Sequence, residues 1–111
     1  MGLLAIVTVM ALQASPMEKA TAEVAAYEDC VLRMAQEFEP VGEGASDTAD
    51  AAVAACDVER GRLRYQVIQL FRENDPDWSA EEVEKFVREG YDKPLRAKAL
   101  VAVFRIRAGT P

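Results

Sequence analysis

The residues in this sequence whose types and spacing could support chemistry begin with two cysteines, Cys30 and Cys56. They do not form a Cys-x-x-Cys motif and the chain contains no histidine, so the usual ligands of a redox or zinc site are missing. Cys30 lies eight residues before Phe38, where we expect one helix to end, and Cys56 lies nine residues after Asp47, where we expect the next to begin. Antiparallel helices about 8 to 10 Å apart would place the two cysteines at the same height. We therefore expect a structural disulfide between them, with a redox or metal site as the alternative.

The paired carboxylates of the sequence do not suit acid–base catalysis. Glu28 with Asp29 and Glu81 with Glu82 are adjacent, and adjacent side chains on a helix point in different directions, so neither pair can share a proton. The acidic turn at residues 73–77 lacks the spacing and the closing glutamate of a calcium loop. Without histidine, the usual general base near neutral pH is also missing. We expect no catalytic residue, no cofactor and no metal ion, so the protein is predicted not to be an enzyme.

A basic stretch near the end of the chain is the third candidate for function. Residues 93–107 contain five basic residues and no acidic one, with apolar residues between them. Such a helix could lie on an anionic membrane surface. Alternatively, its apolar residues complete the core while its basic residues cover an acidic first helix. The candidate membrane or partner face consists of Lys93, Arg96, Lys98, Phe104, Arg105 and Arg107.

Three amphipathic segments must position these residues. Apolar residues recur at steps of three and four, which predicts helices over residues 20–38, from 46 or 47 to 72 or 73, and from Ser79 onward. Ser79 and Glu82 form a capping box at the start of the third helix. The three predicted apolar stripes are Ala20, Val24, Tyr27, Val31, Met34 and Phe38; Ala49, Ala52, Val53, Cys56, Leu63, Val67, Leu70 and Phe71; and Val83, Val87, Gly90, Pro94, Ala97, Val101 and Phe104.

Gly90 and Pro94 interrupt the third segment, although its apolar spacing continues across them. We expect a kink there, or two helices in line with Asp92 capping the second. No run of alternating β-branched residues predicts a strand. The predicted fold class is therefore all-α: one helical domain over residues 18–108, a small antiparallel bundle of three long helices whose first two form a disulfide-linked hairpin.

Residues 1–14 have the features of a signal peptide. From Leu3 to Leu12 every residue except Thr8 is apolar, and this stretch is too short to span a bilayer of about 30 Å. We expect cleavage after Ala14, or alternatively after Ala22. No basic residue precedes the apolar run, and the alternative assignment is the start of a core helix. Export to the periplasm or to the medium would place the cysteines in an oxidising compartment.

The charge of the chain restricts its partners. The net charge is −6 and the pI is about 4.7, which argues against nucleic acid because binding to phosphates needs a concentrated basic surface. Residues 1–56 carry a net charge of −7 and residues 57–111 a net charge of +1. The two halves could therefore attract each other or orient a partner.

One block of residues resembles a known group of proteins. It reads Tyr27-x-x-Cys30-Val31-Leu32, then an acidic loop, then Asp50-Ala51-Ala52 and Ala55-Cys56-x-x-Glu59. This block, about a third of the chain, is similar to small exported two-cysteine helical bacterial proteins of unknown function. The resemblance implies an exported helical hairpin with two cysteines, and it implies no activity.

These observations predict an exported, non-enzymatic protein of the bacterial cell envelope. Its expected partner is another envelope protein or a second copy of itself. One alternative is a module that binds membrane surfaces through the basic C-terminal helix, and another is a thiol redox protein.

Overall fold

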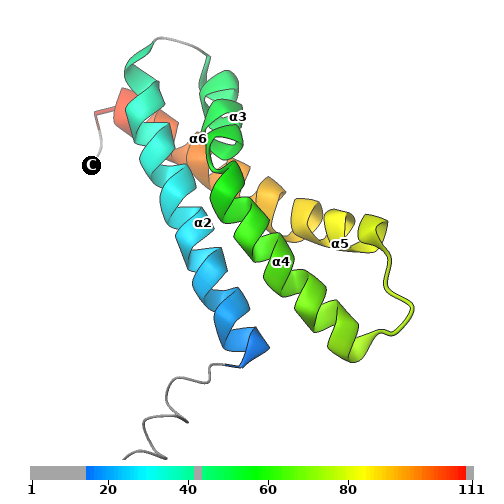
Figure 1. Ribbon diagram of the computed structural model, residues 1–111. Coiled ribbons are helices and arrows are strands. Elements are labelled where there is room, and N and C mark those ends of the chain that lie inside the picture. Colours follow the sequence, from blue (N-terminus) through cyan, green and yellow to red (C-terminus); the bar gives the residue numbers. More distant parts are fainter. Residues whose placement is uncertain (1–14, 42–43, 110–111) are drawn as a thin grey trace, which may run out of the picture.

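The computed structural model describes residues 15–41 and 44–109, which form helices without any strand (Figure 1). The expected all-α fold class is therefore confirmed for these residues. The expected leader, residues 1–14, lies outside the described residues. In chain order the elements are α2 (Pro16–Phe38), the 3-10 turn η1 (Glu39–Val41), α3 (Ala45–Ala55), α4 (Asp57–Asn74), α5 (Ala80–Val87), the π-helical turn η2 (Arg88–Asp92) and α6 (Lys93–Arg107).

Helix α2 begins one turn before the predicted start because Ser15 supplies an N-cap. The Oγ atom of Ser15 accepts a hydrogen bond from the N–H of Glu18 at 3.1 Å, and Pro16 lies in the first turn, where a missing N–H costs little. The helix ends at Phe38, as predicted. Its buried residues are Ala20, Tyr27, Cys30, Val31 and Ala35, which lie on or beside the predicted stripe.

The second predicted helix is divided in two at Cys56. The Cys56 backbone has φ −102° and ψ 34°, and its N–H bonds to the Val53 carbonyl at 3.1 Å instead of the carbonyl four residues back. Helix α3 therefore ends at Ala55, and α4 begins at Asp57. The predicted count of three helices is wrong: the described residues form four helical segments, of which the last is the continuous run α5, η2 and α6.

The π-helical turn η2 changes the register of this last segment. A π turn holds one residue more than an α turn, so the face that reaches the core moves by one position after it. The predicted stripe is wrong beyond Val87, because Val101 and Phe104 are 48% and 57% exposed. The buried residues of α6 are instead Leu95, Ala99 and Val103. The helix continues past Pro94, which lies in the first turn of α6, so the irregularity expected there takes the form of a π turn.

The helices meet around a core of small side chains. In Figure 1, α2 and α4 lie side by side and run in opposite directions; α6 packs against α2 and α3, and α5 packs against α4. The core cluster consists of Tyr27, Cys30, Val31, Ala35, Ala49, Ala52, Cys56, Leu63, Val67, Val83, Val87, Leu95, Ala99 and Val103. Within the described ranges, no helix is both long enough and apolar enough to cross a membrane.

Candidate functional site

Cys30 and Cys56 form a disulfide, as predicted, with their Cα atoms 6.0 Å apart. Cys30 lies in α2 and Cys56 lies at the junction of α3 and α4, so the bond connects the two arms of the hairpin. Both residues are buried. The disulfide therefore closes the hairpin from within the core.

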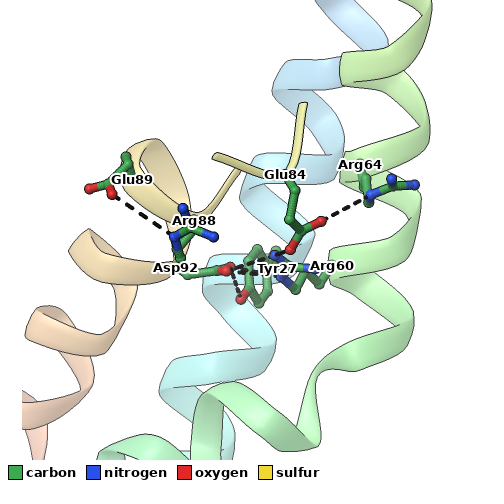
Figure 2. Close-up of polar contacts among 7 residues, drawn as sticks. All are labelled: Tyr27, Arg60, Arg64, Glu84, Arg88, Glu89 and Asp92. Carbon is green, nitrogen blue, oxygen red and sulfur yellow. Dashed lines mark hydrogen bonds and ion pairs between the residues drawn. The ribbon is translucent and has the colours of Figure 1, made fainter. Parts of the chain in front are cut away.

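A polar cluster lies where α2, α4, α5 and η2 meet (Figure 2). We define it as Tyr27 of α2, Arg60 and Arg64 of α4, Glu84 of α5 and Asp92 of η2. Figure 2 shows the guanidinium group of Arg60 between two carboxylates, with the Tyr27 hydroxyl directed at one of them. Arg60 therefore joins α4 to α5 and η2, and Tyr27 adds α2 through Asp92.

The contacts in the polar cluster are short and well aligned. The Tyr27 hydroxyl donates to Oδ1 of Asp92 at 2.6 Å, and Nε of Arg60 donates to both oxygens of that carboxylate at 3.0 Å. Arg60 Nη2 and Arg64 Nε donate to the two oxygens of Glu84, at 2.5 and 3.1 Å. Tyr27 is fully buried, and the side chain of Arg60 is only 20% exposed. Charge-assisted bonds of this kind are stronger than bonds between neutral groups.

The electrostatics of the polar cluster keep Tyr27, Arg60 and Glu84 each in one protonation state. Burial raises the pKa of the Tyr27 phenol well above its usual value of 10, and the hydrogen bond to Asp92 adds to this shift. The hydrogen bond to Asp92 raises the pKa of Arg60, and the hydrogen bond from Arg60 lowers the pKa of Glu84 below its usual value of 4.5. Near neutral pH, Tyr27 is thus a neutral donor, Arg60 a cation and Glu84 an anion. The arrangement suits a structural connection rather than proton transfer.

Asp92 has a different role from the predicted one. Its backbone is helical and its side chain caps neither segment, so the expectation of a helix cap is wrong. The carboxylate instead connects η2 to α2 and α4 through Tyr27 and Arg60. These partners lie 65 and 32 residues away along the chain, and no local pattern in the sequence predicts such contacts.

The predicted basic face of α6 makes contacts with acidic residues of the N-terminal half. The cross-helix pairs join Lys98 to Glu28, Arg96 to Asp50, and Arg107 to Glu39. Lys93 pairs with Glu89 one turn before it, whereas Arg105 makes no ion pair within the described residues, and Phe104 is exposed. This pairing agrees with the interpretation in which the basic helix covers acidic surface.

An aromatic pocket lies on the outer side of α4, α5 and η2. Phe71 and Phe86 meet edge to face with ring centroids 5.6 Å apart, and Phe86 meets Tyr91 in the same way at 5.9 Å. The hollow has a volume of about 420 Å³ and is lined by Phe71, Glu82, Lys85, Phe86, Glu89 and Gly90. Phe86 is 46% exposed. Apolar spacing did not predict this pocket, because Phe86 and Tyr91 lie off the predicted stripe.

A second hollow of about 370 Å³ lies beside the polar cluster, between α3, α4 and the start of α6. Its lining includes Arg60 and Arg96, whose guanidinium groups already bind Asp92 and Asp50. The hollow therefore presents paired charges to a ligand rather than a free cationic group. In the part of the chain that is described, no buried side-chain nitrogen or oxygen lacks a hydrogen-bond partner.

One group of three possible metal ligands occurs among the described residues: the two cysteine sulfurs and a carboxylate oxygen of Glu59. While the sulfurs are joined to each other they are not thiolates, which are the metal-binding form of cysteine. Glu59 was not singled out as a ligand from the sequence, although it lies three residues after Cys56, within one helical turn.

The fold and these sites define a small, disulfide-linked helical protein with a partly buried polar cluster and an open aromatic pocket. No family model, no curated protein and no solved structure matches the chain. Its function is therefore inferred from the contacts of its own residues.

Replacing Tyr27 by phenylalanine is expected to lower the free energy of unfolding by about 1 to 2 kcal/mol, because a buried bond to a charged carboxylate is lost. Urea unfolding of the two proteins measures the difference. Tyr65→Phe is the matched control, since Tyr65 is exposed and makes no hydrogen bond within the described residues. Equal midpoints for Tyr27→Phe and the unchanged chain would show that the Tyr27–Asp92 bond does not stabilise the fold.

Acid should destabilise the protein partly through Glu84. Its pKa is lowered in the folded chain, so the stability from its bonds to Arg60 and Arg64 is complete above about pH 5 and is lost as the pH falls through the folded pKa. Glu84→Gln is expected to flatten the dependence of stability on pH in this window. Glu81→Gln, on the same helix and without an ion pair in the described ranges, should leave the slope unchanged. Equal slopes for Glu84→Gln and the unchanged chain, measured by urea unfolding at several pH values, would contradict the prediction.

Proposed function

We propose that this chain is an exported, non-enzymatic helical protein that acts by binding another protein of the bacterial envelope. The observation that carries the proposal is the aromatic pocket. Its lining combines the aromatic side chains of Phe71 and Phe86 with the charged side chains of Glu82, Lys85 and Glu89. Exposed aromatic side chains beside charged ones are typical of protein-binding surfaces.

The chemistry of the pocket defines the partner that would suit it. Phe86 leaves nearly half of its surface in water, and burying an aromatic side chain is among the larger contributions to binding at an interface. The lining of the pocket carries both signs of charge, in Lys85 and in the carboxylates of Glu82 and Glu89. The fitting partner is a protein segment with one protruding apolar side chain between charged residues.

The polar cluster supports a non-enzymatic role. A catalytic group must exchange protons or bind a reacting atom. Tyr27, Arg60 and Glu84 instead form their hydrogen bonds with other members of the cluster. The sequence also contains no histidine, which is the usual general base near neutral pH.

The start of α2 favours Ala14 over Ala22 as the cleavage site of an exported chain. Such cleavage would leave Ser15 as the first residue and keep the Ser15 cap of the helix. Cleavage after Ala22 would remove the first two turns of α2, including the buried Ala20. An oxidising compartment would preserve the Cys30–Cys56 disulfide.

Membrane binding through α6 is the second hypothesis. Of its five basic residues, Lys93, Arg96, Lys98 and Arg107 already pair with carboxylates. Binding to lipid would have to replace these contacts, and this is why we place protein binding first.

Export is tested by the intact mass of the protein recovered from an exporting bacterial host, with thiols alkylated before and after reduction. We expect a chain that begins at Ser15 and whose cysteines react only after reduction. A full-length chain with two free thiols would contradict export.

Partner binding is tested with a photo-crosslinking amino acid placed at position 86 of the exported chain in such a host. The captured protein is then purified, and its affinity is measured for the unchanged chain, for Phe86→Ala and for Phe104→Ala. We expect Phe86→Ala to weaken binding by about tenfold or more, as loss of a central aromatic contact does, and Phe104→Ala to have little effect.

Three outcomes would contradict the assignment of the pocket. Equal affinities for Phe86→Ala and the unchanged chain would remove the pocket from the interface. A loss confined to Phe104→Ala would move the interface to α6. A cross-link between two copies of the chain would replace the envelope protein with self-association.

A further inference from the structure

The surroundings of the disulfide contain a third potential ligand. The sulfur atoms of Cys30 and Cys56 and a carboxylate oxygen of Glu59 all lie within 4.8 Å of one another. Two sulfurs and one carboxylate at this spacing form a donor set of the kind that zinc accepts, with Zn–S distances near 2.3 Å and Zn–O distances near 2.1 Å. The three residues come from α2, from the junction of α3 and α4, and from the first turn of α4.

Glu59 has no partner of its own among the described residues. It is partly buried, yet it makes no hydrogen bond or ion pair within the described residues. By comparison, the partly buried Glu84 and Asp92 each have two partners. A partly buried carboxylate without a partner, within 4.8 Å of two sulfur atoms, points to a cation.

The backbone at Cys56 suits a negatively charged sulfur. Cys56 is the N-cap residue of α4, and its side chain makes no capping hydrogen bond. The N-terminus of a helix favours negative charge. Two thiolates and the Glu59 carboxylate within 4.8 Å would nevertheless repel one another, and a bound divalent cation removes this repulsion.

We infer that the reduced form of this chain binds one Zn²⁺ ion through Cys30, Cys56 and Glu59, with water as the fourth ligand. This site goes beyond the proposed protein-binding function, because it belongs to the dithiol form and lies in the core. The Cα atoms of the cysteines are 6.0 Å apart, and zinc needs their sulfurs only about 4 Å apart, so side-chain rotation is enough to form the site.

The disulfide form and the zinc-binding dithiol form interconvert by thiol–disulfide exchange. A dithiol reductant transfers two electrons and two protons to the Cys30–Cys56 bond, giving two thiols and the oxidised reductant. Zinc then displaces the two thiol protons. In the reverse direction, a small-molecule disulfide takes two electrons from the thiolates and two protons from water; the protein disulfide forms again, the oxidant leaves as two thiols, and Zn²⁺ is released.

The test is a zinc titration of the exported chain. The chain is first reduced with a dithiol, and the reductant is then removed in the absence of oxygen. Zinc binding is measured by competition with a chromophoric chelator. We expect one zinc ion per reduced chain and no binding to the disulfide form. Co²⁺ in place of zinc should give the sulfur-to-metal charge-transfer absorption and the visible bands of tetrahedral thiolate coordination. No binding to the reduced chain would overturn the proposal.

Variants separate a three-ligand site from binding by the thiols alone. Glu59→Gln is expected to weaken zinc affinity by at least about tenfold. Asp57→Asn is the matched control, because Asp57 also lies in the first turn of α4 and the change in charge is the same, and it should bind zinc as the unchanged chain does. Equal affinity for Glu59→Gln and Asp57→Asn would overturn the assignment of Glu59.

Circular dichroism of the same samples reports whether the site belongs to the fold. The reduced chain should keep its helices, or should regain them when zinc is added. Zinc binding by an unfolded reduced chain, without any gain of helix, would mean that two free thiols bind the metal without a formed site, and this result would also overturn the proposal.

Discussion

The exported chain with both Cys30 and Cys56 replaced by alanine is expected to have a free energy of unfolding about 3 kcal/mol lower than the disulfide-bonded chain. The two cysteines are 26 residues apart, and the bond restricts that loop in the unfolded chain. Because both side chains are buried, the alanines also leave small gaps in the core, which add to the loss. For a domain of this size, the midpoint of thermal unfolding should fall by roughly 15 °C.

Thermal and urea unfolding of the two proteins measure this effect. The unchanged chain in a dithiol reductant without added metal is the second comparison, and its stability should fall to a similar extent. If the double variant unfolds at the same temperature as the disulfide-bonded chain, the disulfide does not stabilise the hairpin. If only the alanine variant is destabilised, the lost stability comes from packing and not from the covalent bond.

Arg60→Met should be the most destabilising single change in the polar cluster, with an expected loss of about 2 to 3 kcal/mol. Methionine keeps the length and the apolar stem of the side chain but removes all of its donors. Asp92 would keep only Tyr27 as a partner, and Glu84 only Arg64. We expect less than the full cost of breaking a buried pair, because the side chain of Glu84 is 40% exposed and water can replace part of the lost interaction.

Arg62→Met is the matched control for this prediction. Arg62 lies on the same helix, is exposed, and makes no ion pair in the described part of the chain, so its replacement should change stability by less than about 0.5 kcal/mol. Adding Asp92→Asn to Arg60→Met should restore part of the loss, because it removes the charge left without its cation. Equal unfolding midpoints for the Arg60 and Arg62 variants would contradict a structural role for the polar cluster.

The hairpin could be predicted from the sequence because its signals are local. The stripe from Ala20 to Phe38 is regular, and Pro40 with the glycines after it ends the helix. Because a short loop joins two antiparallel helices, the number of residues between each cysteine and the loop shows that Cys30 and Cys56 lie at the same level along the helix axes. The disulfide could therefore be predicted from the sequence. A role for Glu59 as a ligand could not, because it depends on the distance from its carboxylate to both sulfurs.

The two irregularities in the helices were less predictable. No proline or glycine marks the break at Cys56, so nothing in the sequence separates α3 from α4. At η2, Gly90 and Pro94 signal an irregularity without defining its type. The ring of Pro94 would clash with the carbonyl of Gly90 in a regular α-helix, and the wider π turn just before Pro94 relieves this clash.

The polar cluster could not be predicted, because each of its members resembles an ordinary residue in its own segment. Arg60 and Arg64 belong to a run of charged residues on α4, and Glu84 follows two other glutamates by a few positions. Bonded partners within the cluster lie between 20 residues (Arg64 and Glu84) and 65 residues (Tyr27 and Asp92) apart in the sequence. Such pairs depend on how whole helices pack, and helix periodicity does not determine this.

The π turn in the last helical segment has the same effect on register as a single inserted residue. With the insertion, Leu95, Ala99 and Val103 face the core. Without it, α6 would rotate by about 100° relative to α5, and a neighbouring row that includes Val101 would turn toward the core. Either of two rows of side chains on α6 could therefore face the core. The number of residues before Pro94, rather than their types, determines which row does so.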